Sequence, residues 1–404
     1  MRYFVEGALR GERLQDTLRR STIIAIISFL TLIDLFGSQA LLPQLVEAYN
    51  VDASTMGVAV NLSTLGMAAS GLAVAWFADR IDRKRGIWLS LALLSIPTFL
   101  LGIVDDLALF AMLRILQGVF MAAAFTLTMT YLSEQCDITA ASGAMAAYIT
   151  GNVASNLFGR LMAGSLAESV GLAGSFFAFA ALNLLGAVIA FVLIGPSSGE
   201  QPVSGQKPGK AWAAHLSNPR LRSSFLIGFV ILFLFVGLFT YVNFELVGPR
   251  LELDPLLLGL VYFVFLPAIF TTPIAGKLAR KWGARNSFWL SAAVTYAGIF
   301  AVWLGNLWVV LLGLSLIGIG LFFAQAAVAG YVGRAAGHSH AAANGLYLSS
   351  YYLGGLFGAF TLGLVYEHLD WTGVTVAAVL ALGIAMLLAR ALREEVAAEP
   401  IKAS

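Results

Sequence analysis

The chain has 404 residues, of which 59% are hydrophobic and only 11% are charged, and its formal net charge is +2. Globular domains carry roughly 25% charged residues, so this composition excludes a soluble protein with a large core. The sequence has no basic stretch typical of nucleic-acid binding, and its single cysteine, Cys136, excludes an internal disulfide. Apolar runs long enough to cross about 30 Å of hydrocarbon recur along the whole chain, which indicates an integral helical membrane protein.

Charged residues and turn residues divide the chain into twelve apolar segments, each of which we predict to be a membrane-spanning helix. The charged amino terminus lacks the small-residue cleavage site of a signal peptide, so we expect the first span to be retained. In chain order the predicted spans are 21–46, 55–78, 86–104, 107–132, 142–166, 171–195, 223–248, 256–276, 286–304, 307–332, 341–366 and 371–390.

One connection between the spans is long, residues 196–222, and it is rich in Gly, Pro, Ser and Lys. This composition predicts a flexible linker. We therefore expect a six-helix bundle at 1–195, a cytoplasmic linker at 196–222, and a second six-helix bundle with a short cytoplasmic tail at 223–404.

Lys and Arg residues are distributed very unequally between the two sides of the predicted membrane. If the amino terminus is cytoplasmic, 21 of the 24 lie in cytoplasmic segments, one lies in an outer loop (Arg250), and two lie within spans (Arg114 and Arg160). This asymmetry follows the positive-inside rule. We expect both termini to be cytoplasmic.

The two predicted bundles contain similar sequences at similar offsets. LFGRLMAG (157–164) matches LFGAFTLG (356–363) at a shift of 199, which also pairs Tyr148 with Tyr347. Two fused six-helix repeats are typical of secondary transporters, whose binding site lies near the midplane between the repeats. Matches among small residues alternatively reflect helix packing alone.

Two short motifs resemble those of a known transporter family. The loop after the second span is similar to the pattern G-x-x-x-D-R/K-x-G-R-R/K, and its charged positions match at Asp79, Arg80, Arg83 and Lys84. Ala75 and Asp82 stand at the two glycine positions of that pattern.

The fourth span contains the second motif, R-x-x-Q-G, as Arg114, Gln117 and Gly118. With twelve spans and a central linker, the chain resembles the major facilitator superfamily over nearly its whole length. The resemblance implies an all-α integral membrane fold of two six-helix pseudo-repeats. It also implies transport by alternating access, a monomeric protein, and a cytoplasmic latch formed by the charged loop.

Three further segments, MTYLSE, GNVASNLFGRLMAG and GLYLSSYYLGG, resemble a bacterial branch of that superfamily that is similar to arabinose-efflux permeases and drug:proton antiporters. This resemblance implies a bacterial inner membrane, a small-molecule substrate and protons as the coupling ion. The antiporter signature of the fifth helix normally contains a Gly-Pro pair, and here only Gly151, Gly159 and Gly164 remain. The direction of transport therefore stays open between export and import.

Three charges within the predicted spans share a depth. At about 1.5 Å per residue, Asp34 lies about 20 Å from the cytoplasmic start of its span, and Arg114 and Arg160 lie about 10 Å from the outer surface. Charges in lipid pair with one another or face an aqueous cavity. A neighbouring arginine favours the charged form of a carboxyl group, whereas loss of water favours its neutral form. We therefore expect Asp34 to carry a coupling proton and Arg114 to bias its binding.

Two of these charges have alternative roles. Asp34 is alternatively one half of a permanent salt bridge within the amino-terminal bundle. Arg160 is alternatively an arginine that extends to the outer headgroups, or a counter-charge for an anionic substrate.

Polar side chains within the spans are the candidates for substrate binding, because an amide in hydrocarbon needs a partner or water. Tyrosines combine apolar area with a hydrogen-bonding hydroxyl, which suits organic ligands, although aromatic stripes also serve helix packing. The predicted substrate-binding residues are Arg160, Gln117, Asn152, Asn243, Gln325, Tyr347 and Tyr351.

These observations together predict a proton-coupled exporter of a small organic molecule. The alternative is an uptake carrier or facilitator for a small organic anion or sugar. The sequence contains no HExxH, no G-x-S-x-G and no intramembrane metal-ligand set, so we expect neither an enzyme nor a cofactor. The expected partners are substrate, protons and the lipid bilayer.

Overall fold

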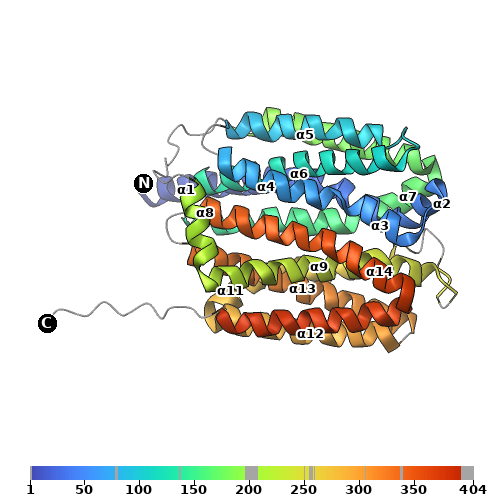
Figure 1. Cartoon of the computed structure of the whole chain (residues 1–404). Coiled ribbons are helices and arrows are strands. Elements are labelled where there is room, and N and C mark those ends of the chain that lie inside the picture. The colour runs from blue at the N-terminus through green and yellow to red at the C-terminus, as the bar shows by residue number, and fades with distance from the viewer. Residues whose placement is uncertain are drawn as a thin grey trace.

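The computed structural model describes residues 2–77, 81–135, 138–195, 208–249, 251–253, 258, 260–304, 306–336 and 340–392. The described chain is helical almost throughout (Figure 1). Its longer helices are α1 Arg2–Ala40, α4 Ser63–Phe77, α5 Arg83–Leu100, α6 Leu107–Gln135, α7 Ile138–Leu193, α9 Pro219–Val247, α11 Leu266–Trp282, α12 Ala284–Leu304, α13 Leu307–Ala335 and α14 His340–Leu388. Shorter helices are α2 Leu42–Tyr49, α3 Ala53–Asn61, α8 Pro208–Ser217, η2 Tyr262–Phe265 and η3 Ala389–Ala391.

The twelve predicted spans are present. Eight stretches of the described chain are long and apolar enough to cross a membrane. Two of them, in α7 and α14, each hold two spans, which meet at turns at Gly171 and Asp370. The third and eighth spans are α5 and the η2–α11 pair.

The two turns lie at equivalent places in the sequence repeat. Gly171 has φ of 73° and Asp370 has φ of 53°, and these positions are 199 residues apart. Positive φ breaks a right-handed helix, and glycine or aspartate tolerates it better than most residues. The predicted breaks between 166 and 171 and between 366 and 371 are therefore confirmed.

Small residues bring matching helix pairs into close contact. A Cβ atom at Gly159 on α7 would collide with the carbonyl of Ile33 on α1, and one at Gly358 on α14 would collide with the carbonyl of Phe233 on α9. Gly159 and Gly358 are also 199 residues apart. Backbones that approach this closely gain the van der Waals contact that holds helices together in lipid.

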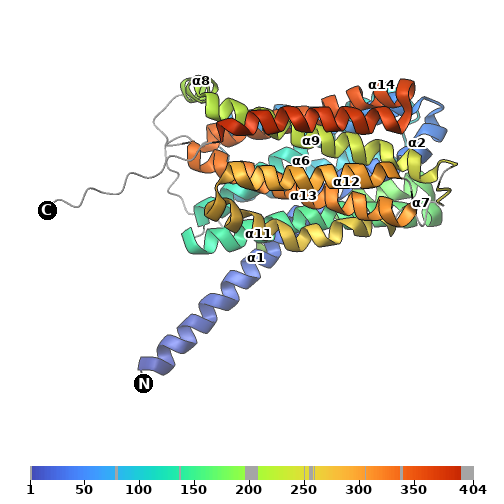
Figure 2. The same cartoon turned by 90° about the horizontal axis from the view of Figure 1, so that it is seen from below.

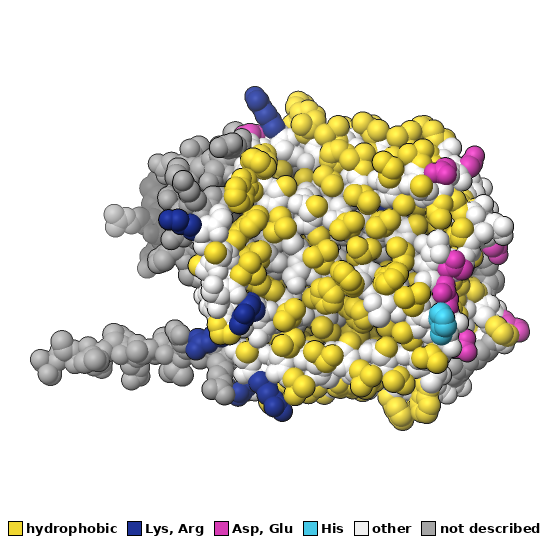
Figure 3. All heavy atoms as spheres, viewed as in Figure 1, with side chains coloured by type: hydrophobic (Ala, Val, Ile, Leu, Met, Phe, Trp, Pro, Cys, Tyr) yellow, Lys and Arg dark blue, Asp and Glu magenta, His cyan; other side chains and the backbone are white. Residues whose placement is uncertain are grey.

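Hydrophobic side chains form a continuous belt around the visible face of the bundle (Figure 3). Large apolar side chains are well exposed on the molecule, including Trp308 (77%), Phe270 (68%) and Met112 (66%). Lys and Arg side chains gather at one end of the belt, and Asp and Glu at the other. An apolar belt between two charged ends is what a protein surrounded by lipid requires. We call the two ends the basic end and the acidic end.

Part of the predicted flexible linker is an ordered helix, which corrects that expectation. Helix α8 runs across the basic end (Figure 1), and the first part of α1 projects out of the bundle at the same end, away from α8 (Figure 2). Trp212 of α8 packs edge-on against Trp76 of α4, with ring centroids 5.3 Å apart. Alanine, leucine and lysine favour a helix, and the contact between the two tryptophans anchors it.

Candidate functional site

Asp34 lies in a polar network within the amino-terminal helices. Its side chain is completely buried. Oδ2 accepts hydrogen bonds from the Thr98 hydroxyl, the Gln117 amide and the Asn183 amide, each at 3.0 Å. These donors come from α5, α6 and the second part of α7, so Asp34 faces the interior of its own bundle. Oδ1 is buried without a hydrogen-bond partner.

Thr98 connects the members of this network. Its oxygen also accepts from Gln117 at 2.7 Å and from Asn183 at 3.1 Å, and it lies 2.8 Å from the carbonyl of Leu94. A hydroxyl has one proton, so Thr98 donates either to Leu94 or to Asp34. The network can therefore rearrange its hydrogen bonds without moving a helix.

Arg114 is joined to Asp34 through Gln117. Its Nη1 donates to Gln117 Oε1 at 2.5 Å and to Ser38 Oγ at 3.2 Å. The remaining nitrogens donate to Val60 O at 2.8 Å and to Ser63 Oγ at 3.0 Å. Among the described residues Asp34 makes no ion pair. Asp34 and Arg114 therefore lie near each other, as expected, but Gln117 separates them and they make no direct contact.

Arg160 lies in a second group, although its predicted depth matches that of Asp34. The guanidinium is completely buried. Nε donates to Asn156 Oδ1 at 3.0 Å and Nη2 donates to Gln39 Oε1 at 2.5 Å, whereas Nη1 has no partner. The ring centroid of Tyr262 lies 4.4 Å from the guanidinium carbon, so Arg160 contacts the carboxy-terminal bundle.

Amide side chains extend this second group across the two bundles. Gln39 donates to Asn61 Oδ1 at 2.8 Å, and Asn61 lies within 3.4 Å of Thr240 on α9. Asn243 on α9 donates to the carbonyl of Gln39 at 3.4 Å, and its Oδ1 accepts from the Tyr262 hydroxyl. We call Gln39, Asn61, Arg160, Asn243 and Tyr262 the polar bridge.

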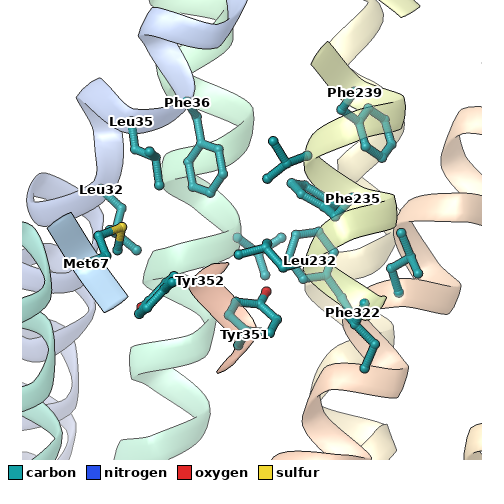
Figure 4. Close-up of a cluster of buried hydrophobic side chains, with 14 of the residues drawn as sticks. Leu32, Leu35, Phe36, Met67, Leu232, Phe235, Phe239, Phe322, Tyr351 and Tyr352 are labelled. Carbon is teal, nitrogen blue, oxygen red and sulfur yellow. The ribbon is translucent and has the colours of Figure 1, made fainter. Parts of the chain in front are cut away.

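Aromatic side chains meet between the bundles beside the polar bridge. Phe36 on α1 and Phe235 on α9 point toward each other, with centroids 6.4 Å apart (Figure 4). Phe235 also lies 5.2 Å from Phe322 and 5.8 Å from Phe265 between ring centroids. We call these four residues the aromatic cluster.

The other predicted substrate-binding residues are spread over three helices. Tyr347 and Tyr351 on α14 are stacked with centroids 6.1 Å apart, and the buried hydroxyl of Tyr347 has no partner. Asn152 on α7 also has a buried oxygen without a partner. Gln325 on α13 is half-buried. None of the contacts found for these described residues joins them to the Asp34 network.

Two of the four residues of the predicted latch are described. Arg83 is buried and donates to Ile81 O at 2.9 Å, and the ammonium of Lys84 lies 5.8 Å from the Phe191 ring centroid. Asp79 and Arg80 lie outside the described residues. The latch stays a prediction.

Sequence reasoning missed several members of both groups, namely Thr98, Asn183, Gln39, Asn61, Asn156 and Tyr262. One signal was present for the amides, since each lies within an apolar span, as Asn243 and Gln325 do. Thr98 and Tyr262 carried no such signal, because hydroxyls are common in helices that pack closely in lipid.

A sequence model of the Major Facilitator Superfamily matches residues 24–266 and 247–404. The chain belongs to this superfamily. An uncharacterized MFS-type transporter of Bacillus subtilis strain 168, YybF, is 28% identical over 349 residues, which is 86% of each chain. The inner membrane transport protein YnfM of Escherichia coli K12 is 26% identical over 357 residues, covering 88% of this chain and 85% of that protein.

Solved structures of the superfamily share the fold. A bacterial homologue of the human lysosomal transporter Spinster, in an inward-facing and unoccupied conformation, superposes with a TM-score of 0.73. The match covers 94% of this chain and 99% of that homologue, at 15% sequence identity. The expected twelve-helix major facilitator fold is confirmed. The protein is a multi-pass membrane transporter of small molecules and not an enzyme.

Proposed function

We propose that this major facilitator protein is a proton-coupled transporter that exports a small organic molecule by alternating access. Asp34 binds the coupling proton. Arg114 biases that binding, and the substrate occupies the interface between the bundles, beside the aromatic cluster. Arg160, Asn243, Gln325, Tyr347 and Tyr351 are the proposed substrate contacts. We propose that Gln117, which was predicted as a substrate contact, acts with the proton-binding residues, because it hydrogen-bonds both Asp34 and Arg114.

The observation that carries this proposal is the environment of Asp34. It is a buried carboxyl group surrounded by neutral donors, with one oxygen free of hydrogen bonds. A permanent salt bridge would place a cation in direct contact with it. Here the cation linked to it, Arg114, acts across Gln117. A group held in this way can gain or lose a proton without breaking an ion pair.

A modest helix movement is enough to couple this proton to transport. Gln117 and Arg114 lie on α6, whereas Asp34 lies on α1, whose neighbouring residues Phe36 and Gln39 contact the other bundle. We propose that α1 also shifts against α6 when the bundles rock. Such a shift changes the separation of Asp34 from Arg114, and with it the proton occupancy of Asp34.

The orientation follows from the distribution of charge. Under the positive-inside rule a basic end is cytoplasmic, and we propose that the basic end and both termini lie on that side. The name of the relative YnfM supports an inner membrane. The tetracycline resistance protein of class H from Pasteurella multocida is 26% identical over 133 residues, which is 32% of each chain. Export is one way in which a membrane protein gives resistance, and this is the reason for which we propose export here. We propose that the protein acts as a monomer, and that Asp79, Arg80, Arg83 and Lys84 form its cytoplasmic latch.

The test is transport in proteoliposomes with an imposed pH gradient, using a compound selected by thermal-shift screening and beginning with tetracycline. Asp34→Asn should abolish gradient-driven transport while substrate exchange at equal pH continues, because the amide occupies the same space and cannot ionise. Arg285→Gln, at the basic end, is the matched control. Gradient-driven transport that persists in Asp34→Asn rules out the proposed coupling site.

Uptake of an organic anion is the second candidate function, and the buried charge of Arg160 favours it. The same proteoliposomes distinguish the two directions. An exporter accumulates substrate against its gradient only when protons flow in the opposite direction. A proton-driven importer moves both in the same direction.

A further inference from the structure

We infer that the substrate of this transporter is an amphipathic organic anion, whose carboxylate binds Arg160 and whose apolar body binds the aromatic cluster. This inference rests on the proposed function, which leaves the chemical class of the substrate open. Four observations carry it: the charge balance around Arg160, the unpartnered Nη1, the contrast with Arg114, and the position of both groups between the bundles.

The charge of Arg160 is not compensated by the protein. Its guanidinium lies against the neutral amides of Asn156 and Gln39 and against Tyr262, whose ring and hydroxyl are both beside it. No carboxylate of the described residues forms an ion pair with it. A buried cation without a counter-charge is costly in a low-dielectric interior. An anionic ligand would supply the missing charge.

One donor of Arg160 is free to bind that ligand. Nη1 is buried and has no hydrogen-bond partner. By contrast, all three nitrogens of Arg114 donate to protein oxygens. Both arginines are completely buried, so burial does not explain the difference. Arg114 has all its partners within the fold, whereas Arg160 has an unused donor. Guanidinium donors match the geometry of a carboxylate.

Arg160 also lies at the contact between the two bundles. Its guanidinium contacts Phe36 on α1, with 5.9 Å to the ring centroid, and Tyr262 on η2 of the opposite bundle. Separation of η2 from α7 would uncover the guanidinium. Binding at the contact between the two repeats is expected of this architecture.

The surroundings of Arg160 also indicate what the rest of the ligand is. Phe36 links the guanidinium to Phe235, and Phe235 packs against Phe265 and Phe322. These four side chains are buried in the structure, and the surface that they would form when the bundles separate is apolar and aromatic. An aromatic or branched aliphatic body fits it, with the carboxylate at one end.

The experiment compares aromatic carboxylates with their neutral amides. Purified full-length protein in detergent is titrated with benzoate, 4-phenylbutyrate and 1-naphthoate and with the corresponding amides, and binding is measured by thermal shift and calorimetry. At least one carboxylate should bind the wild-type protein about tenfold or more tightly than its amide, because only the anion gains a charge-assisted hydrogen bond. If no carboxylate binds more tightly than its amide, the inference is wrong.

Variants assign the preference to Arg160. Arg160→Gln should remove the carboxylate preference and Arg160→Lys should retain part of it. Arg285→Gln, whose guanidinium lies 5.5 Å from the Trp289 ring centroid, should leave it unchanged. A preference that survives in Arg160→Gln would overturn the assignment. The wild-type comparison remains decisive if that variant does not fold.

Binding at equal pH does not depend on proton coupling, so the two proposals fail separately. Carboxylate binding without gradient-driven transport would contradict the proposed function and leave this inference intact. Proton-driven transport of neutral or cationic compounds, without carboxylate binding, would do the reverse.

Discussion

The side-chain amide of Gln117 donates to Oδ2 of Asp34 at 3.0 Å, and the carbonyl oxygen of the same side chain accepts from Arg114. One neutral residue thus lies between the opposite charges of Asp34 and Arg114. This arrangement gives the helix-four motif a physical role: its arginine and its glutamine act on Asp34 as a unit.

Replacement of Gln117 by leucine should disconnect that unit. Asp34 loses one donor and Arg114 Nη1 keeps only Ser38, and lost hydrogen bonds to buried charged groups cost about 1–3 kcal/mol. We expect a lower melting temperature and a loss of gradient-driven transport, measured in detergent and in proteoliposomes respectively. Normal coupling in Gln117→Leu would show that Arg114 and Asp34 act independently.

Gradient-driven transport should depend on the hydroxyl of Thr98 and not on the shape of its side chain. Thr98→Val has nearly the same volume but leaves Gln117 and Asn183 with one acceptor fewer. Its gradient-driven transport should fall strongly, whereas Thr98→Ser should retain most of it. Equal activities of the two variants would exclude the hydroxyl from proton handling.

Gly57 on α3 allows the acidic end to close. A Cβ atom there would lie 2.6 Å from the Tyr241 hydroxyl of the opposite bundle, so Gly57→Val should force the bundles apart at that end. The buried Thr240, replaced by cysteine in a Cys136→Ser background, reports the change. We expect maleimide labelling of this cysteine to become several-fold faster in Gly57→Val.

Gly333→Val is the matched control for that experiment, because nothing lies within 4 Å of a Cβ atom at Gly333. It should leave the labelling rate unchanged. The same slow labelling in both glycine variants would mean that the contact between Gly57 and Tyr241 does not hold the acidic end closed.

The lowered pKa of Asp52, which caps α3, leads us to predict a loss of stability in acid. Hydrogen bonds from the Thr55 backbone and hydroxyl lower the pKa of Asp52 to about 2. Since the pKa is lower in the folded state, this stabilisation is complete above the unfolded pKa of about 3.9 and is lost as the pH falls toward 2. Asp52→Ala should cost about 1 kcal/mol near neutral pH.

The difference in melting temperature between wild type and Asp52→Ala should therefore shrink between pH 5 and pH 2. Asp52→Asn provides the control, since asparagine caps a helix about as well and does not titrate in this range. A difference that stays constant across that range would contradict the assigned pKa.

The spans, their turns and the depth of each charge followed from the sequence alone. Hydrophobic length and charge are local properties, and lipid forces every span to satisfy its backbone within its own helix. The breaks near Gly171 and Asp370 were predicted for the same reason. Asp34 was identified because a carboxylate is costly in hydrocarbon and is kept there for few reasons.

Only the tertiary structure decided which charges meet. Asp34 and Arg160 share a predicted depth, yet Asp34 faces α5 and α6 whereas Arg160 faces Gln39 and Tyr262. Depth along a helix says nothing of the direction in which a side chain points around it. That direction depends on how the helices pack, and close contacts such as Gly159 on Ile33 set it. The same packing gives every guanidinium nitrogen of Arg114 a partner and leaves Nη1 of Arg160 without one.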